Sequence, residues 1–149
     1  MPPTSSEPGF RDRIAASFAR QAMMSTLGAR LLLVEDGIVE IELPFRPELA
    51  QQHGFLHAGA IASVLDSACG YAAYTRMPVD TTVLSIEFKL NLLAPAVGER
   101  LIARARVIRA GRTITVTQAD GFMRTAEVER HVATLIGTMM CVRDSGLAG

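Results

Sequence analysis

Residues 51–75, QQHGFLHAGAIASVLDSACGYAAYT, hold a single carboxylate in a run of mostly small or apolar residues. Asp66 is the only formally charged side chain between His57 and Arg76. Burial of an acid costs free energy, so such a residue either has a partner or is kept for chemistry. A low-dielectric environment also raises the pKa of a carboxyl group, which makes it a better base near neutral pH. Asp66 is therefore a candidate general base on water or a candidate nucleophile.

The start of the same stretch offers a second chemical feature. The run 58–75 is rich in alanine and too long for a strand, so it predicts a buried helix that begins just after His57. The first N–H groups of a helix have no intrahelical acceptor, and the helix dipole is positive at that end. Ala58 and Gly59 are small enough to let a carbonyl approach the backbone. The Ala58 N–H is thus a candidate donor to an oxyanion.

These two features cannot meet within one chain. Eight residues separate Ala58 from Asp66, which corresponds to about 12 Å along a helix. A second copy of the helix, antiparallel to the first, would bring residue 58 of one chain beside residue 66 of the other. The sequence therefore predicts that any joint chemistry requires a dimer.

The surrounding segments predict a sheet that holds this helix. Apolar residues that recur every three to four positions predict a short amphipathic N-terminal helix, which starts near Phe10 and ends at Gly28. Segment 43–57 is expected to be a loop because of its prolines. The predicted strands cover residues 29–35, 37–43, 83–93, 101–108, 113–119 and 132–142. The Asp36-Gly37 turn joins the first two of them, and a turn at 109–112 joins the fourth and fifth. This order predicts an α+β fold, an antiparallel sheet wrapped around one long central helix, whose edges favour dimerisation.

Composition narrows the class of protein. The chain has 149 residues, with 15 Lys plus Arg and 15 Asp plus Glu. The near-zero net charge gives no sign of nucleic-acid or membrane binding. The first residues lack the features of a secretory signal, and Cys69 and Cys141 form neither a disulfide framework nor a metal motif. We expect a disordered tail over residues 1–9, a single domain over 10–149, a cytoplasmic location and no metal.

Several motifs resemble those of hotdog-fold acyl-CoA thioesterases, in the branch typified by phenylacetate-pathway (PaaI-like) proteins. In that family a His-Gly-Gly turn opens the central helix, and an acid follows nine positions after the His. Here His57-Ala58-Gly59 and Asp66 have that spacing, with Ala58 in place of the first glycine. The segments FKLNLLAPAVGERL (88–101) and GRTITV (111–116) are similar to the family's strand exit and next hairpin. The resemblance spans roughly residues 28–142.

The resemblance implies a function and a set of roles. The protein would hydrolyse an acyl-CoA to a free acid and coenzyme A, as a homodimer or a tetramer and without a cofactor. Its catalytic residues would be Asp66, Gln51, Ala58 and His57, where Gln51 replaces the usual asparagine. Its substrate-binding residues would be Gly59, Ser85, Arg109 and Arg112, of which the two arginines would contact the phosphates of coenzyme A.

Other interpretations stay open on the sequence alone. Asp66 has a structural alternative, in which it bonds to hydroxyls of Ser63, Ser67 or Tyr71. His57 fits a positioning role better than proton transfer, and Gln51 fits a solvated loop amide as well as it fits a carbonyl ligand. Ser85 shares the alternation of Glu87 and Lys89 and so is expected on the solvent face of its strand. The arginines 104, 106, 109 and 112 also suit a solvated sheet surface.

Three further alternatives concern the reaction itself. Cys69 is expected to be a core thiol, because it lies three turns from His57 on the same helix. A non-catalytic protein that binds or senses acyl-CoA is the principal rival function. A hydratase of the same fold is disfavoured because residues 67–75 contain no histidine to pair with the acid.

Overall fold

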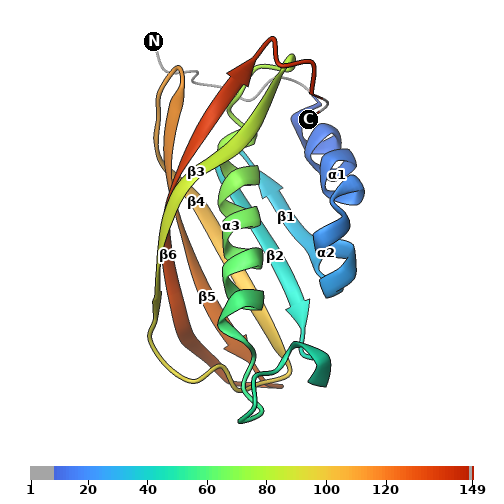
Figure 1. Ribbon diagram of the computed structural model, residues 1–149, viewed down its shortest axis with the longest axis vertical. Helices are drawn as coiled ribbons and strands as arrows, with labels where there is room; N and C mark the ends of the chain where they lie inside the picture. The colour runs from blue at the N-terminus through green and yellow to red at the C-terminus, as the bar shows by residue number, and fades with distance from the viewer. Residues whose placement is uncertain (1–8, 148) are drawn as a thin grey trace.

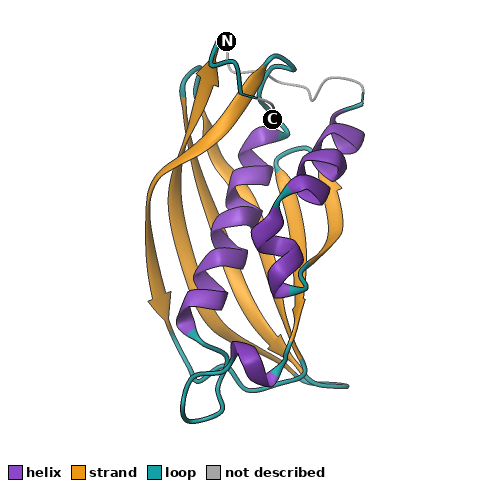
Figure 2. Cartoon of the chain, turned by 45° about the vertical axis from the view of Figure 1, so that its right-hand side comes forward, coloured by secondary structure: helices purple, strands orange, loops and turns teal. Residues whose placement is uncertain are grey.

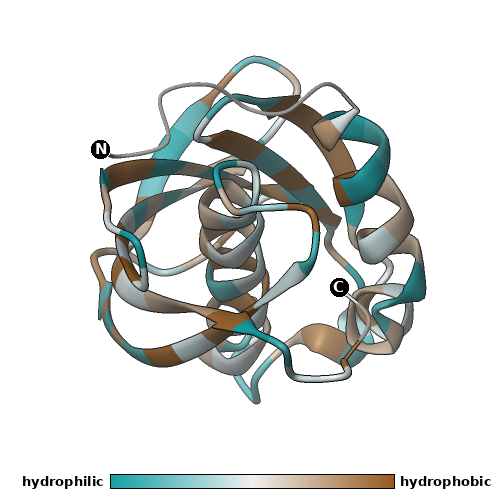
Figure 3. Cartoon of the chain, turned by 90° about the horizontal axis from the view of Figure 1, so that it is seen from above, coloured by the Kyte–Doolittle hydropathy of each residue, from teal (hydrophilic) through white to brown (hydrophobic). Residues whose placement is uncertain are grey.

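The computed structural model describes residues 9–147 and 149. One antiparallel sheet curls around one long helix, and this arrangement is seen from the side in Figure 1 and end-on in Figure 3. The strand order is β1-β2-β4-β5-β6-β3. The elements in chain order are α1 (Phe10–Arg20), α2 (Ala22–Leu27), β1 (Arg30–Glu35), β2 (Ile38–Pro44), the 3₁₀ turn η1 (Pro47–Leu49), α3 (Ala58–Tyr74), β3 (Thr81–Leu92), β4 (Arg100–Ala110), β5 (Ile114–Arg124) and β6 (Glu129–Arg143). The predicted fold class is confirmed.

Helix α3 occupies the concave side of the sheet because most of its surface is apolar. Ten of its 17 residues are buried, and they extend around most of the helix. The sheet supplies the other half of this core, including the fully buried Leu101, Leu135 and Met139. The predicted helix over 58–75 is confirmed to within one residue. Burial of this apolar surface is the dominant stabilising contribution to such a fold.

The N-terminal helix differs from the prediction. It is split into α1 and α2 at Gln21, whose backbone is extended, although it does end at Gly28 as predicted. The two pieces pack beside α3 (Figure 2). The Gln21 side chain accepts a hydrogen bond from Ser67 Oγ at 3.0 Å and donates one to the Tyr71 hydroxyl at 3.3 Å. These contacts to α3 accompany the interruption at Gln21. The spacing of apolar residues in the sequence did not predict this interruption.

The ends of the chain and of the strands need smaller corrections. Of the predicted tail, residues 1–8 lie outside the described residues, and Gly9 caps α1. Strand β2 extends through Pro44 into the segment predicted as loop, and Pro44 is its last residue. The Asp36-Gly37 turn is confirmed, with Glu35 paired to Ile38. None of the described helices combines the length and apolar character needed to span a membrane.

Strand β3 forms one edge of the sheet and leaves apolar side chains uncovered. It pairs with β6 on one side only. Phe88 and Leu92 face the concave side, opposite Gly137 and Ala133 of β6, yet they stay 43% and 53% exposed. An edge strand of 12 residues that carries exposed apolar side chains is a surface that proteins normally cover or pair.

Candidate active site

Asp66 lies on the side of α3 that faces the start of β3. Its carboxylate accepts a hydrogen bond from Ser85 Oγ at 2.8 Å. Both residues line a cavity of about 170 Å³, together with polar groups of the α1–α2 junction. Asp66 is partly buried and not fully buried as the sequence suggested, because this cavity opens beside it.

Desolvation is the main influence on this acid. Partial burial raises the pKa of Asp66 above its ordinary value, and the hydrogen bond from Ser85 acts in the opposite direction because it stabilises the carboxylate. The three hydroxyls named by the structural alternative bond elsewhere: Ser63 to the Gly59 carbonyl, Ser67 to Gln21, and Tyr71 to Ser17 and Gln21. A raised pKa beside a cavity is typical of an acid used in chemistry.

Ser85 reaches Asp66 because of a β-bulge. The register between β3 and β6 shifts at Ile86, so that Ser85 lies opposite Met139 while Glu87 lies opposite Thr138. The extra residue turns Ser85 to the concave side and leaves Glu87 on the outer face, where it bonds to Thr138. The prediction that Ser85 shares a solvent face with Glu87 and Lys89 is therefore wrong. The sequence also selected Ser85 as a candidate site residue, and the structure places its side chain beside Asp66.

The N-terminus of α3 is capped by His57. Its Nδ1 accepts a hydrogen bond from the Gly59 N–H at 2.7 Å, which leaves the imidazole in a positioning role. A β-carbon at residue 59 would lie only 2.9 Å from that Nδ1, so a larger residue here would displace the His57 ring from its present position. Within the described residues the N–H of Ala58 has no hydrogen-bond acceptor. Ala58 thus presents the free helix-terminal donor that the sequence predicted.

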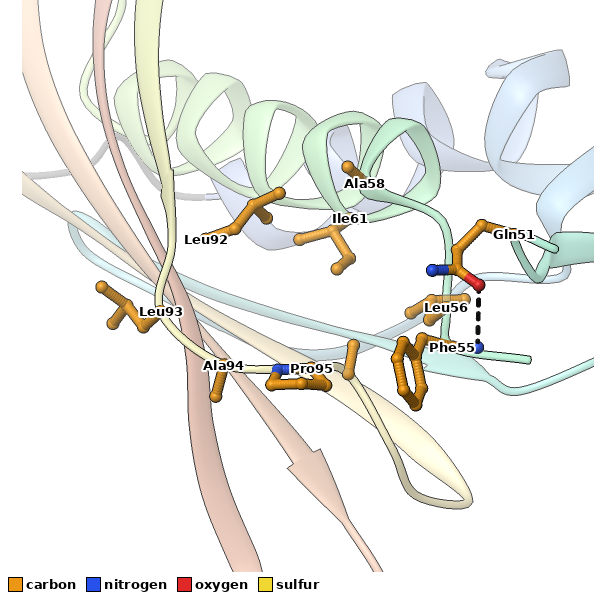
Figure 4. Close-up of a pocket in the computed structure, with 10 residues that line it drawn as sticks. Gln51, Phe55, Leu56, Ala58, Ile61, Leu92, Leu93, Ala94 and Pro95 are labelled. Carbon is orange, nitrogen blue, oxygen red and sulfur yellow. Dashed lines mark hydrogen bonds between the residues drawn. The ribbon is translucent and has the colours of Figure 1, made fainter. Parts of the chain in front are cut away.

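Gln51 lines a second cavity together with Ala58. The volume of this cavity is about 410 Å³, and Figure 4 shows the two residues on its rim with Ile61, Leu92 and Leu93. The Gln51 Oε1 accepts hydrogen bonds from the backbone N–H groups of His53 and, at 3.4 Å, Phe55. Since Oε1 faces donors, the amide must turn its Nε2 donor away from them, toward the cavity in Figure 4. Amide and helix N–H together suit a carbonyl oxygen that gains negative charge.

The two halves of the site lie at opposite ends of β3. Thr82 and Val83, near its start, line the Asp66 cavity, and its last residue, Leu92, lines the Ala58 cavity. The acid and the free helix donor of one chain are therefore separated along both α3 and β3. This agrees with the separation of about 12 Å that helix geometry predicts for residues 58 and 66.

The remaining candidates lie apart from these two cavities or in different surroundings. Arg112 lines a third cavity at the far end of α3, whereas Arg109 lies on β4 opposite Val116 and lines none of these three cavities. Cys69 is fully buried, and burial raises the pKa of its thiol to about 12, so the predicted core thiol is confirmed. His131 pairs with Asp120 at 3.0 Å and stacks on Phe122.

Metal ligation has no support in the part of the chain that the structure describes. No three His, Cys, Asp or Glu side chains gather there in a group that could hold an ion. The Ser17 and Gln21 groups beside Asp66 were not selected from the sequence, because α1 approaches α3 only in the folded chain. No local motif marks them.

This chain is similar in sequence and in fold to known proteins of one family. The family model for the thioesterase superfamily matches residues 53–129. A relative from Halobacterium salinarum, named "Putative esterase", is 32% identical over 134 residues, which cover 82% of this chain and 85% of the relative.

Two solved structures extend the comparison. A crystal structure of a thioesterase family protein from Silicibacter pomeroyi has a TM-score of 0.89 and 47% identity, covering 91% of this chain and 99% of that one. The E. coli PaaI protein from the phenylacetic acid degradation operon shares the fold, with a TM-score of 0.80 at 18% identity over 93% and 96% of the two chains. The chain therefore belongs to the thioesterase superfamily, shares the hotdog fold of the E. coli PaaI protein, and is a thioester hydrolase.

Proposed function

We propose that the protein hydrolyses an acyl-coenzyme A to a free acid and coenzyme A, at a site shared between two chains of a homodimer. The observation that carries this proposal is the division of the machinery. The Asp66–Ser85 pair lies at one end of the edge strand β3, and the Gln51–Ala58 donors lie at the other. Neither half is sufficient alone, because hydrolysis needs both an activated water and donors for the oxyanion.

Pairing of two β3 strands would unite the halves. If two copies of β3 meet antiparallel about their midpoints, the start of each strand lies beside the end of the other. The Asp66 cavity of one chain would then adjoin the Ala58 cavity of its partner. The same contact would cover Phe88 and Leu92, whose exposure on the concave side otherwise goes uncompensated.

The reaction at this shared site follows from the groups present. The thioester carbonyl accepts hydrogen bonds from the Ala58 N–H and the Gln51 amide of one chain. Asp66 of the other chain removes a proton from water, whose oxygen attacks the carbonyl carbon. As the tetrahedral intermediate collapses, the carbon–sulfur bond breaks and the protonated Asp66 returns its proton to the leaving thiolate. No cofactor takes part in this sequence.

Ser85 orients Asp66 and tunes its acidity in this mechanism. Replacement of Ser85 by alanine removes the hydrogen bond that stabilises the carboxylate, so the pKa of Asp66 is expected to rise further. The base must be ionised, so the acid limb of the kcat profile should move to higher pH in the variant. A pH–rate series on wild type and Ser85→Ala measures this. A limb that stays in place, or moves to lower pH, contradicts the assignment.

A tetramer remains a prediction with one supporting feature. On the outer face of the sheet, Leu84 pairs with Met140, which in turn pairs with Ile114 on β5. All three side chains are exposed and form an apolar row across three strands. Contact between such rows of two dimers would bury them.

The test of the proposed function is release of free thiol from a panel of acyl-CoA substrates. Turnover of at least one acyl-CoA, with kcat/KM above about 10⁴ M⁻¹s⁻¹, is expected for a dedicated enzyme. If the purified protein binds acyl-CoA without releasing thiol from any of them, the sensing role replaces catalysis. The Asp66 cavity favours the enzyme, because a sensor has no need for an acid of raised pKa beside the ligand.

A further inference from the structure

Gly70 is a glycine in the interior of α3 that neither the backbone nor the packing of the chain requires. It lies one helical turn beyond Asp66, about 6 Å along the axis, and lines the same cavity of about 170 Å³. A β-carbon built on it would meet no described atom within 4 Å, and its φ lies outside the left-handed region. Glycine inside a helix is destabilising relative to alanine. The chain bears this cost at a position where a side chain would project into the Asp66 cavity.

The walls of this cavity carry many hydrogen-bonding groups. Seven of its nine lining residues have a hydroxyl, amide or carboxyl group, whereas Gln51 is the only polar side chain among the ten that line the Ala58 cavity. Where the α1–α2 junction meets α3 (Figure 2), Gln21 Nε2 donates to the Tyr71 hydroxyl at 3.3 Å, and Ser17 Oγ lies 3.3 Å from the same hydroxyl. An amide nitrogen has two N–H donors and a hydroxyl both donates and accepts, so these groups have capacity left for a ligand.

The volume of the cavity indicates which part of an acyl-CoA enters it. About 170 Å³ holds about five or six groups of the size of a water molecule. The pantetheine arm of coenzyme A is longer than this space, and it must also leave the site because it continues to the nucleotide. A short acyl group ends within such a space, between walls supplied by the N-terminal helices, α3 and β3.

We propose that Gly70 sets the length of the acyl group that the protein accepts, and that Gln21 and Tyr71 select a group with a hydrogen-bonding atom at its far end. The identity of the ligand as an acyl-CoA rests on the proposed function. The carbonyl group lies beside Asp66, the acyl chain passes over Gly70, and a terminal hydroxyl reaches the Gln21–Tyr71 pair. Tyr71 follows Asp66 by five residues, about 8 Å along the helix. A chain of about five bonds, together with a terminal hydrogen bond, spans this distance.

Binding of non-hydrolysable ligands tests the role of this cavity without turnover. In each probe a CH₂ group separates the sulfur of coenzyme A from a ketone carbonyl, so no thioester is present. Calorimetry compares the analogues of acetyl-, hexanoyl- and ω-hydroxyvaleryl-coenzyme A, of which the last two are equal in size and differ only in a terminal methyl or hydroxyl group. Wild type is expected to bind the hydroxylated analogue at least about tenfold more tightly than the hexanoyl analogue, because a methyl group leaves the polar groups of the cavity unpaired.

Gly70→Leu should weaken binding of the two longer analogues roughly 100-fold and leave the acetyl analogue within about threefold of wild type. The leucine side chain takes the space of about three or four methylene groups, and each buried methylene contributes about fourfold to affinity. Gly70→Ala is the matched control, because it also removes the glycine but adds a single methyl group. It should unfold a few degrees above wild type and weaken binding of the longer analogues by less than about fivefold.

Gln21→Leu tests the selection of the terminal hydroxyl. Leucine is similar in size to glutamine but has no amide, so the ratio of the affinities for the hydroxylated and hexanoyl analogues should fall to within about threefold of unity. Tyr71→Phe, which removes only a hydroxyl, should lower the same ratio. A ratio of two affinities on one variant separates this role from a loss of stability, which would affect both ligands alike.

These measurements distinguish the role of the cavity from thioester hydrolysis itself. If wild type and variants show the expected differences but no thiol is released from any acyl-CoA, the cavity still selects the acyl group, in a binding protein. If acyl-CoA is hydrolysed while Gly70→Leu weakens all three analogues alike, or none of them, Gly70 does not set acyl length. Failure of wild type to bind any analogue, a wild-type preference for the hexanoyl analogue, or loss of the wild-type oligomeric state in Gly70→Leu would each overturn the proposal.

Discussion

Replacement of Asp66 by asparagine is expected to lower kcat for thioester hydrolysis by about 10²–10⁴-fold, the usual contribution of a positioned general base. Asparagine keeps the size of the side chain and can still accept the hydrogen bond from Ser85, so the loss isolates the proton-accepting carboxylate. Thiol release from the best acyl-CoA measures it. Asp120→Asn is the matched control, because Asp120 is an acid on β5 that pairs with His131 and lines neither active-site cavity. Equal rates for wild type and Asp66→Asn would remove Asp66 from the mechanism.

The same variant should be more stable than wild type at neutral pH. The pKa of Asp66 is raised in the folded chain, so between the unfolded and folded pKa values the folded state binds more protons. Stability contributed by this residue therefore falls as pH rises through that window. Asparagine never ionises and escapes the penalty, so Tm should exceed that of wild type at pH 7, with the difference disappearing at a pH below the ordinary carboxyl pKa. A lower Tm at pH 7 would indicate a structural acid instead.

Replacement of Ala58 by proline is expected to lower kcat by about 10²–10³-fold, the cost of one oxyanion donor. Proline lacks the N–H group in question, yet it is well tolerated at the first position of a helix. His57 precedes it with φ −63° and ψ 138°, a conformation that a following proline permits. The substitution thus removes the unpartnered donor and leaves the helix intact.

Two measurements check that a loss of activity in Ala58→Pro comes from the missing N–H group. Thermal unfolding should match wild type within a few degrees, because no hydrogen bond of the folded chain is lost. Ala58→Gly, which keeps the N–H and changes only the side chain, should keep most of the activity. A proline variant as active as the glycine variant would show that the Ala58 amide does not contact the reacting carbonyl.

Local chemistry made much of the fold predictable. The apolar, alanine-rich run over 58–75 gave α3 to within a residue, and Asp36-Gly37 gave the first hairpin, because both signals lie within a few neighbouring residues. Position in the helix also identified the free N–H of Ala58. These features depend on backbone geometry that the adjacent sequence dictates.

Features that depend on contacts between distant parts of the chain could not be predicted from neighbouring residues. The bulge at Ile86 turns Ser85 toward Asp66, and strict alternation along β3 gives the opposite face for this residue. The break at Gln21 accompanies hydrogen bonds to α3 residues more than 40 positions away. The third cavity, at the far end of α3, is lined by residues from three separate segments, so the sequence selected Arg112 but not its neighbours Arg76 and Arg143.

Mixing two inactive variants tests the shared site most directly. Chains carrying Asp66→Asn and chains carrying Ala58→Pro are unfolded together, refolded at equal amounts and assayed for thiol release. In a mixed dimer one site combines the intact Asp66 of one chain with the intact Ala58 of the other, so random assembly should restore about a quarter of wild-type activity. Activity no greater than the average of the two separate variants would mean that each chain hydrolyses its substrate alone, and would contradict the account.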